Sequence, residues 1–259
     1  MSPALRRTLI AAAVVLALLA AAVGGFAAWG LNAYRAEPAP LGEALALPGV
    51  RTEIADDAVV LAPADGGDGT GVVFYPGARV EAEAYAASWA PIVQDTGVTV
   101  VIPRMPLNFA VLDPDRADEA AAAHGEGVDR WYLGGHSLGG AMAASHAGGD
   151  PDLALAGLVL WGSYATEGAG LAERDDLRVL SVSGSEDALS DPATIEANGP
   201  YLPADAERVE IDGMNHAQFG AYGDQSGDGT ARISDTDARG ALAEAVTAFL
   251  AQDPGQGRD

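Results

Sequence analysis

The sequence contains no cysteine, and lysine is absent as well. Without cysteine the chain forms no disulfide, no cysteine-ligated metal site and no thiol nucleophile, so any catalysis must use oxygen or nitrogen atoms. The 14 basic residues are therefore all arginine, and against 37 acidic residues they leave a formal net charge of -23. Such a charge repels phosphate backbones and anionic headgroups. We expect a solvated acidic surface and no nucleic-acid partner.

Charged residues are also missing from one long stretch near the N-terminus. Leu9 to Leu31 is a run of 23 uncharged, mostly apolar residues, and about 20 suffice for a helix to cross a bilayer. Arg6 and Arg7 precede the run, which places the N-terminus in the cytoplasm and the rest of the chain beyond the membrane. The alternative is a signal peptide cleaved after small residues near 22 or 27, which would release a secreted protein. The length of the run favours the uncleaved anchor.

The remaining composition, 49% hydrophobic and 20% charged over 259 residues, is typical of one globular domain. We expect residues 1–36 to form the signal anchor, a transmembrane segment. Residues 37–49 are rich in proline and alanine and predict a semi-extended linker. The catalytic domain should span residues 50–251, and residues 252–259 should form a disordered tail.

Within that domain, short apolar runs alternate with segments of helical periodicity. This alternation favours an α/β fold with a mainly parallel sheet covered on both faces. The predicted strands are 58–62, 70–75, 98–102, 130–133, 155–161, 177–183 and 208–211, and the predicted helices are 81–95, 113–124 and 236–250.

A glycine-flanked serine lies between the strand at 130–133 and an alanine-rich helix. Gly135, Ser137 and Gly139 have the spacing of a nucleophile elbow, a tight strand-to-helix turn that exposes its serine. A side chain at either glycine would collide with the neighbouring strand or helix. The N–H of Leu138, at the helix N-terminus, is placed to stabilise a developing oxyanion.

A serine hydroxyl needs a histidine to take its proton. Of the four histidines, His216 follows the last predicted strand directly, in the place that such a base occupies. His124 and His146 are expected to be solvated or packed on helices. His136 adjoins Ser137, and the alternation of side chains along a strand predicts that it points to the opposite side of the sheet.

The acid that orients the histidine should lie between the serine and the histidine in sequence, after the penultimate strand. Asp187 is the first choice in that loop, and Glu186, Asp191 and Asp212 are alternatives.

Enzymes with this serine turn take a second oxyanion donor from the loop after an early strand. Ala78 is the first choice and Gly77 the second. The connection 162–176 is too short for a lid, so we expect an open site. Arg79 is expected to form a surface pair with Glu83. The side chains predicted to contact substrate are those of Tyr75, Asn108, Trp161, Tyr164 and Phe219.

Residues 224–235 have the spacing of a calcium loop, with acidic or hydroxyl residues at its ligand positions. Asp235 stands where such a loop has a bidentate glutamate, and no entering helix is evident. We interpret the segment as a polar turn and expect no metal and no other cofactor.

The elbow, the loop acid and the late histidine resemble the α/β-hydrolase superfamily over Val50 to about Leu250. The segments 75–78, 104–108, 135–139 and 215–220 resemble more narrowly its small capless branch, the dienelactone-hydrolase-like proteins. Dienelactone hydrolases themselves use a cysteine nucleophile, which this chain lacks, so the resemblance implies the fold and a serine nucleophile but not that activity. The His-Gly-Gly-Gly loop of many lipases is also missing.

The sequence thus predicts a membrane-anchored serine hydrolase that cleaves small-molecule carboxylic esters outside the cytoplasm, through Ser137, His216 and Asp187 and an acyl-enzyme. A thioesterase or acyltransferase on the same triad is the first alternative. A binding protein that kept the fold without turnover is the second. The oligomeric state is left open.

Overall fold

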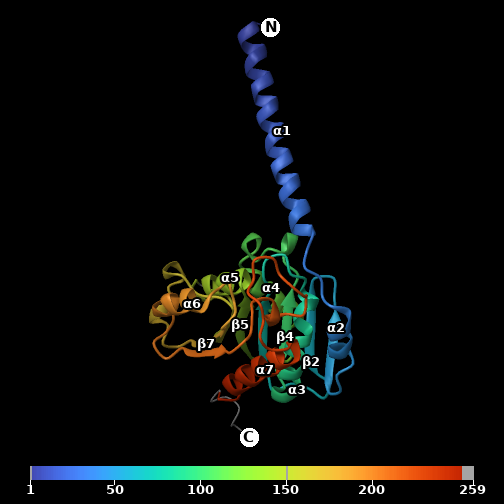
Figure 1. The fold of residues 1–259 in the computed structure, drawn as a ribbon, viewed down its shortest axis with the longest axis vertical. Helices are drawn as coiled ribbons and strands as arrows, with labels where there is room; N and C mark the ends of the chain where they lie inside the picture. Colours follow the sequence, from blue (N-terminus) through green and yellow to red (C-terminus); the bar gives the residue numbers. More distant parts are fainter. Residues whose placement is uncertain (1, 150, 253–259) are drawn as a thin grey trace.

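The computed structural model describes residues 2–149 and 151–252. An eight-stranded sheet forms the centre of this part of the chain, in the order β1-β2-β4-β3-β5-β6-β7-β8 (Figure 1). The strands from β3 to β8 are parallel, whereas β2 is antiparallel to both of its neighbours. Their bounds are Val50–Ile54 (β1), Ala58–Pro63 (β2), Thr70–Tyr75 (β3), Thr99–Pro103 (β4), Arg130–His136 (β5), Leu155–Trp161 (β6), Arg178–Gly184 (β7) and Glu207–Ile211 (β8).

Helices cover both faces of the sheet, and each covered face has its own hydrophobic cluster. Alternate residues of β3 contribute to the two clusters, Phe74 to one and Tyr75 to the other, as the twofold repeat of a strand requires. Helices α2, α3 and α7 pack on the Phe74 side, and α4 and α5 on the Tyr75 side. The helices are α2 (Pro38–Leu45), α3 (Ala86–Thr96), α4 (Arg116–His124), α5 (Leu138–Gly148), α6 (Pro192–Asn198) and α7 (Asp235–Ala251). Single 3-10 turns are η1 (Ala82–Tyr85), η2 (Pro106–Asn108), η3 (Ala110–Leu112), η4 (Glu167–Ala169), η5 (Leu171–Glu173), η6 (Gly199–Tyr201) and η7 (Ala217–Phe219).

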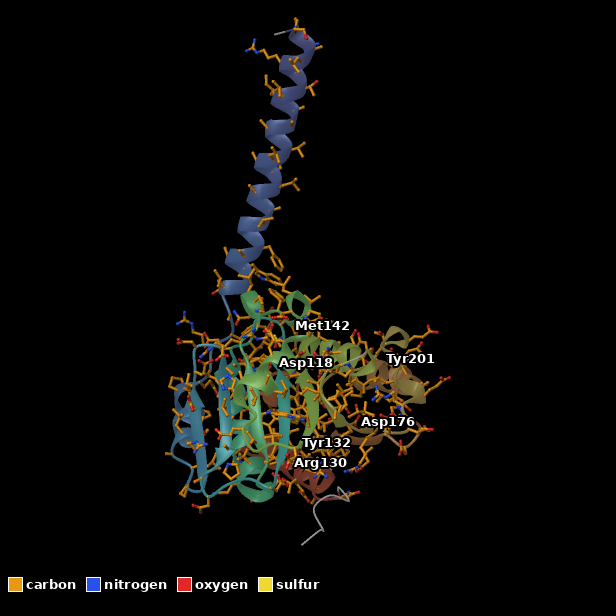
Figure 2. All side chains as sticks on the ribbon, turned by 180° about the vertical axis from the view of Figure 1, so that it is seen from behind. Asp118, Arg130, Tyr132, Met142, Asp176 and Tyr201 are labelled. Carbon is orange, nitrogen blue, oxygen red and sulfur yellow. The ribbon has the colours of Figure 1, made fainter. Side chains whose placement is uncertain are left out.

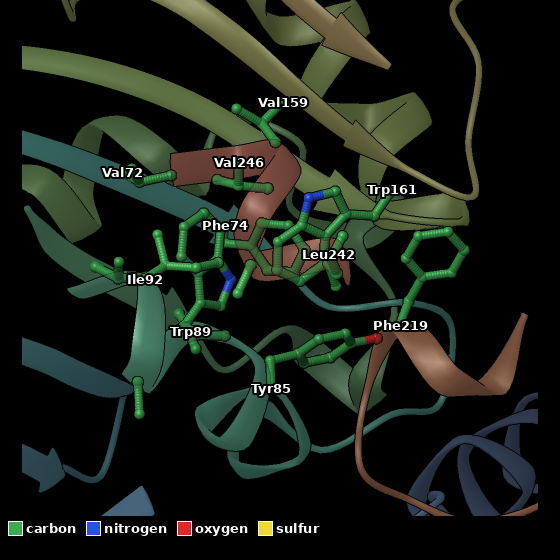
Figure 3. Close-up of a cluster of buried hydrophobic side chains, with 14 of the residues drawn as sticks. Val72, Phe74, Tyr85, Trp89, Ile92, Val159, Trp161, Phe219, Leu242 and Val246 are labelled. Carbon is green, nitrogen blue, oxygen red and sulfur yellow. The ribbon is translucent and has the colours of Figure 1, made fainter. Parts of the chain in front are cut away.

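Aromatic rings fill the Phe74 side beneath the carboxyl ends of the strands (Figure 3). The ring of Phe74 lies 4.4 Å from Trp161 and 5.2 Å from Trp89, and the two indoles stack at 4.8 Å, all between centroids. On the opposite side, α4 and α5 contribute only alanines to the buried cluster, so these two helices approach the sheet closely. The elements that end at the elbow are therefore packed against rigid neighbours on both faces.

The predicted order of strands and helices is confirmed for the elements named above, with shifted ends. The predicted helix 81–95 is divided into η1 and α3, and the predicted helix 113–124 begins only at Arg116. Strand β1 and helix α6 were not predicted. The connection between β6 and β7 is described in full and contains only η4 and η5, with no cap domain.

The semi-extended linker predicted at 37–49 is wrong for most of its length, because residues 38–45 form helix α2. Pro38 stands in the first turn, where a proline loses no helical hydrogen bond, and Ala44 is buried against α3 and β1. The apolar residues Leu41 and Leu47 pack on the same cluster. Burial of this apolar side favours the helix over the extended chain that proline content predicts. Apart from Gln252, the predicted disordered tail lies outside the described residues.

Helix α1 (Pro3–Leu31) projects from the domain and, along its length, buries only Gly30 (Figures 1 and 2). Its most apolar window has a mean hydropathy of 2.6. It is the one helix in the described part of the chain that is long and apolar enough to cross a membrane, and a signal sequence would meet the same criterion.

Candidate active site

Ser137 lies at the turn between β5 and α5 with φ 54° and ψ -126°. A non-glycine residue in this region carries backbone strain of about 1–3 kcal/mol, which neighbouring contacts must offset. The Ser137 N–H donates to the carbonyl of Trp161 at 3.0 Å, and the Ser163 hydroxyl donates to the Ser137 carbonyl at 2.7 Å. The elbow is thus held by two hydrogen bonds, one to Trp161 at the end of β6 and one from Ser163, two residues later.

The two flanking glycines permit this turn, as predicted. A Cβ atom at Gly135 would lie 2.5 Å from the carbonyl carbon of Gly139. A Cβ atom at Gly139 would collide with the carbonyl oxygens of Tyr75 and Pro76. Because all of these obstacles are backbone atoms, no side-chain movement relieves them.

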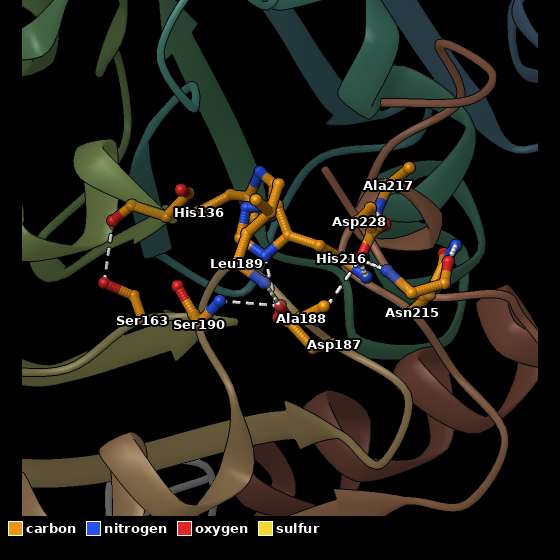
Figure 4. A network of polar contacts seen from close by, with 12 residues as sticks. His136, Ser163, Asp187, Ala188, Leu189, Ser190, Asn215, His216, Ala217 and Asp228 are labelled. Atoms are coloured by element: carbon orange, nitrogen blue, oxygen red, sulfur yellow. Dashed lines mark hydrogen bonds and ion pairs between the residues drawn. The ribbon is translucent and has the colours of Figure 1, made fainter. Parts of the chain in front are cut away.

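His216 and Asp187 form a buried pair on the loops after β8 and β7 (Figure 4). Nδ1 of His216 lies 2.7 Å from Oδ2 of Asp187, and both side chains are at most 1% exposed. The other oxygen, Oδ1, accepts the N–H groups of Leu189 and Ser190 at 2.9 and 2.7 Å. With a carboxylate at Nδ1, that nitrogen carries the proton and donates, so Nε2 presents a lone pair.

Nε2 of His216 is buried and has no hydrogen-bond partner among the described residues. A buried imidazole nitrogen without a partner is costly unless a reacting group completes it. No hydrogen bond joins it to the Ser137 hydroxyl within residues 2–149 and 151–252. Such bonds are often long in the absence of substrate and tighten when it binds.

Three contacts bring the elbow, the acid and the base to one edge of the sheet. Ser137 bonds to the carbonyl of Trp161, and a Cβ atom built on the next residue, Gly162, would lie 3.0 Å from Oδ2 of Asp187. The imidazole of His136 lies 4.3 Å from that of His216, between ring centroids. The edge is formed by the carboxyl ends of parallel strands, where such sheets bind ligands.

His136 is predicted to point to the side of the sheet opposite Ser137, and in the structure its ring lies beside those of Tyr85, Phe219 and His216. Strand alternation does not extend past His136, because Ser137 has left the extended conformation. Burial, together with the nearby His216, holds the pKa of His136 well below 6.5, so this ring is neutral. Its Nδ1 lies 2.9 Å from the Tyr85 hydroxyl, which accepts the Gly77 N–H at 2.9 Å. His136 therefore connects His216 to the loop after β3.

The two remaining histidines have partners of their own. Nε2 of His124 lies 3.1 Å from a carboxylate oxygen of Asp57, whose pKa this hydrogen bond lowers. Nδ1 of His146 lies 3.1 Å from Asp115. Within the described chain, neither imidazole has a hydrogen bond, ion pair or ring contact with Ser137 or His216, so both lie outside the candidate site.

The three alternative acids are likewise engaged elsewhere. Glu186 and Asp212 both pair with Arg232, at 2.7 and 2.9 Å. Asp191 caps α6 by accepting the N–H of Thr194 at 3.0 Å, and hydrogen bonds from Thr194 lower the pKa of Asp191.

Asp228 is the residue of this region that sequence reasoning did not select. Its carboxylate accepts the N–H groups of Ala217 at 2.8 Å, Gly229 at 2.7 Å and His216 at 3.2 Å. It also accepts the N–H of Ala188, beside the acid, at 3.4 Å. It thus joins the loop of His216 to the loop of Asp187. The sequence pattern at 224–235 did not distinguish this role from calcium binding. Carboxylates that accept backbone N–H groups and carboxylates that bind cations occur in similar turns.

Within the described chain, the backbone N–H groups of the two predicted oxyanion donors, Ala78 and Leu138, make no hydrogen bond. The N–H of Gly77, the second choice for the oxyanion donor, is engaged by Tyr85. Ala78 and Leu138 are both half-buried.

Most of the predicted substrate contacts are structural instead. Tyr75, Trp161 and Phe219 are fully buried. The hydroxyl of Tyr75 donates to the carbonyl of Pro114 at 2.8 Å and accepts the N–H of Ala117 at 2.7 Å. Trp161 packs within the aromatic cluster, and Phe219 packs between Trp161 and the rings of the candidate site.

Of the three remaining polar or aromatic residues, Asn108 and Arg79 bind helix α1. Asn108 donates from its amide to the carbonyl of Gly30 at 3.1 Å, and Tyr164 is half-buried. The predicted pair of Arg79 with Glu83 is wrong: Glu83 pairs with Arg104 at 2.6 Å, and Arg79 binds the end of α1. Local sequence could not reveal this, because the partner of Arg79 lies 50 positions away.

The chain belongs to the alpha/beta hydrolase family, which its residues 71–240 match. No sequence relative is found among curated proteins. The fold is similar to that of a thermostable esterase from Pseudomonas putida, at 18% identity and a TM-score of 0.54 over 82% of this chain and 88% of that one. It is also similar to an esterase domain from Rhodothermus marinus, at 15% identity and a TM-score of 0.55 over 77% and 97%. A third similar structure is a butyrate-bound esterase from the planctomycete Thermogutta terrifontis, at 15% identity and a TM-score of 0.54 over 82% and 97%.

Proposed function

We propose that this protein is a membrane-anchored serine hydrolase of carboxylic esters that uses Ser137 as nucleophile, His216 as general base and Asp187 as the acid that orients it. The observation that carries the proposal is the buried His216–Asp187 pair beside a strained serine turn, with Nε2 of the imidazole left unpartnered. Within the family, the absence of a cap fits a capless branch related to dienelactone hydrolases, here with serine in place of cysteine.

In the proposed reaction the Ser137 oxygen attacks the ester carbonyl carbon while its proton passes to Nε2 of His216. The bond from that carbon to the leaving alcohol oxygen then breaks, and the proton moves from Nε2 to the alcohol. Water attacks the resulting acyl-enzyme, with His216 again taking the proton and returning it to Ser137. The sum is one ester and one water converted to one carboxylic acid and one alcohol. General-base assistance of this kind contributes about a hundred- to ten-thousandfold in rate.

The N–H groups of Leu138 and Ala78 are proposed to bind the oxyanion of the tetrahedral intermediate. Each such donor contributes about 3–4 kcal/mol of transition-state stabilisation. The lack of a hydrogen bond from either N–H group within the described chain supports this assignment. The structurally similar esterases support an ester as substrate, and the open connection after β6 supports access for acyl groups from outside.

Helix α1 is proposed to remain as a membrane anchor, with the hydrolase domain outside the cytoplasm and beginning at α2. Its exposed apolar surface and the arginines that precede it support this topology. Fractionation of cells and protease accessibility of the domain test the topology, and release of the domain into the soluble fraction would contradict it.

The catalytic proposal is tested on the full-length protein in detergent, with a fluorophosphonate probe and p-nitrophenyl butyrate. We expect labelling and turnover in the wild type and loss of both in Ser137→Ala. Ser145→Ala, an exposed serine further along α5, is the matched control and should keep both. Labelling that survives Ser137→Ala would show that another residue is the nucleophile.

A further inference from the structure

The C-terminal end of α1 is docked on the loop that follows β4, at the same edge of the sheet as the candidate site. Phe26 and Trp29 each place a ring 5.2 Å from the ring of Phe109. A Cβ atom at Gly30 would lie 2.7 Å from the carbonyl oxygen of Leu107, so only glycine permits this close approach. The helix is therefore seated on the domain, not merely tethered to it.

The docking contacts reach the residue next to the proposed oxyanion donor Ala78. Arg79 donates from Nε to the carbonyl of Trp29 at 3.0 Å and from its terminal nitrogen to the carbonyl of Asn32. Its guanidinium lies 4.7 Å from the centre of the Trp29 ring. Arg79, which binds α1, is adjacent in sequence to Ala78, and consecutive Cα atoms are about 3.8 Å apart. The contact with α1 therefore lies within one residue of the proposed oxyanion donor.

Backbone hydrogen bonds also join the segment after α1 to the domain. Tyr34 accepts the N–H of Glu81 at 3.0 Å and donates its own N–H to Arg79 at 2.6 Å. Glu37 then donates its N–H to Ala221, on the loop of the proposed base, at 2.8 Å. The orientation of the site relative to the helix is thus fixed at several points.

The length of the apolar run sets where the bilayer surface falls. Twenty-three helical residues span about 34 Å, close to the hydrocarbon thickness of about 30 Å. The surface then lies near Trp29, level with the loop that holds α1. That loop carries two exposed large apolar side chains, Val111 and Leu112, at 50% and 47% exposure. Outside α1, the other exposed large apolar side chains in the described chain are Leu45, Ile54 and Leu189, at 46%, 45% and 41%, and each of them is less exposed than Val111 and Leu112.

We propose that the ester cleaved at Ser137 belongs to a lipid that stays in the bilayer, and that its carbonyl reaches the serine from the membrane side, past the loop 107–112. The inference rests on the proposed ester hydrolysis and names its substrate class. The net charge of -23 disfavours anionic headgroups, so the substrate is an ester of a neutral lipid. For a diacylglycerol, one water and one ester bond give one monoacylglycerol and one fatty acid.

The test uses the full-length protein in phosphatidylcholine vesicles. Dioleoylglycerol is placed either in the same vesicles as the protein or in separate protein-free vesicles, and p-nitrophenyl butyrate is supplied in the water phase. We expect release of oleate when lipid and protein share a bilayer, and at least tenfold less when they do not. Equal release from both kinds of vesicle, or cleavage of the soluble ester alone, would overturn the inference and leave the proposed hydrolase intact.

A variant separates membrane contact from catalysis. Val111→Asn combined with Leu112→Asn should lower oleate release about tenfold, because the loop no longer enters the interface, while turnover of the soluble ester stays within twofold. Leu45→Asn, an exposed position on α2, should change neither rate. Equal loss for both substrates, or no loss for the lipid, would contradict the inference. Absence of turnover on both substrates and of probe labelling in the wild type would instead refute the hydrolase proposal itself.

Discussion

Replacement of Asp228 by alanine should damage catalysis without touching the proposed triad. The two short hydrogen bonds of its carboxylate, 2.8 Å to Ala217 and 2.7 Å to Gly229, would each be worth about 1.5–3 kcal/mol if fully buried. Asp228 is half-buried, so water replaces part of this, and we expect Asp228→Ala to lose about 2–4 kcal/mol of unfolding free energy. Asp228→Asn keeps one acceptor oxygen and should lose about half as much.

The same change should displace the backbone of His216, whose N–H the carboxylate accepts. A misplacement of about 1 Å in such a group costs on the order of a hundredfold in rate. We therefore expect kcat on p-nitrophenyl butyrate to fall tenfold to a hundredfold with KM nearly unchanged. Fluorophosphonate labelling should slow in parallel, which a loss of stability alone would not cause in the folded fraction. Asp224→Ala, an exposed neighbour, is the control. A kcat within twofold of the wild type in folded Asp228→Ala would refute the reasoning.

Gly139→Ala should prevent stable folding, because its Cβ collides with backbone carbonyls. Gly240→Ala, on an open face of α7, should instead raise the unfolding free energy by about 0.5–1 kcal/mol in urea titrations. Similar unfolding free energies for the two variants would contradict this prediction. The pKa of His136 is lowered on folding, so the stability tied to its neutral form is present above pH 6.5 and is lost as the pH falls below it. Between pH 7.5 and 5.5 the unfolding free energy of the wild type should fall by about 1.4 kcal/mol more than that of His136→Asn. Parallel dependences of the two unfolding free energies on pH would show that His136 is not a buried, neutral imidazole. Tyr85→Phe leaves the Gly77 N–H unpaired, so we expect a loss of about 1–3 kcal/mol in unfolding free energy and a lower kcat. An unchanged kcat would show that the hydrogen bond from Gly77 to Tyr85 does not affect the proposed oxyanion donor Ala78.

The sequence was sufficient for features that are decided within a few residues. Gly135 is required by backbone atoms of the turn itself, and its spacing from Ser137 and Gly139 predicted the elbow, although the atoms that exclude a side chain at Gly139 belong to Tyr75 and Pro76 after β3. The strands of the buried sheet are covered on both faces and appear as continuous apolar runs, which made them recognisable. Helix α2 was missed for the opposite reason, because its stability comes from burial against α3 and β1, which proline content does not reveal.

Residue types with two common roles were not resolved by the sequence. Tyr75 and Trp161 occur at strand ends, where aromatic side chains serve either substrate or core, and only packing placed them in the core. Strand alternation did not reveal the contact of His136 with His216, because that contact is made by the loop after β8. Arg79 has its nearest acidic neighbour in sequence at Glu83, yet the carbonyls at the end of α1 outcompete it because they lie closer in space.

By itself, the sequence determined the α/β architecture, the serine turn, the apolar N-terminal helix and a short set of candidate acids and bases, because each follows from local sterics, periodicity or composition. Only the tertiary structure decided which of these side chains meet. Asp187 and His216 are 29 positions apart, and they come together because β7 and β8 pair in parallel, with Gly184 opposite Ile211, so that both following loops leave the same edge of the sheet. The seating of α1 beside Ala78 was decided in the same way, by contacts between segments that no local pattern connects.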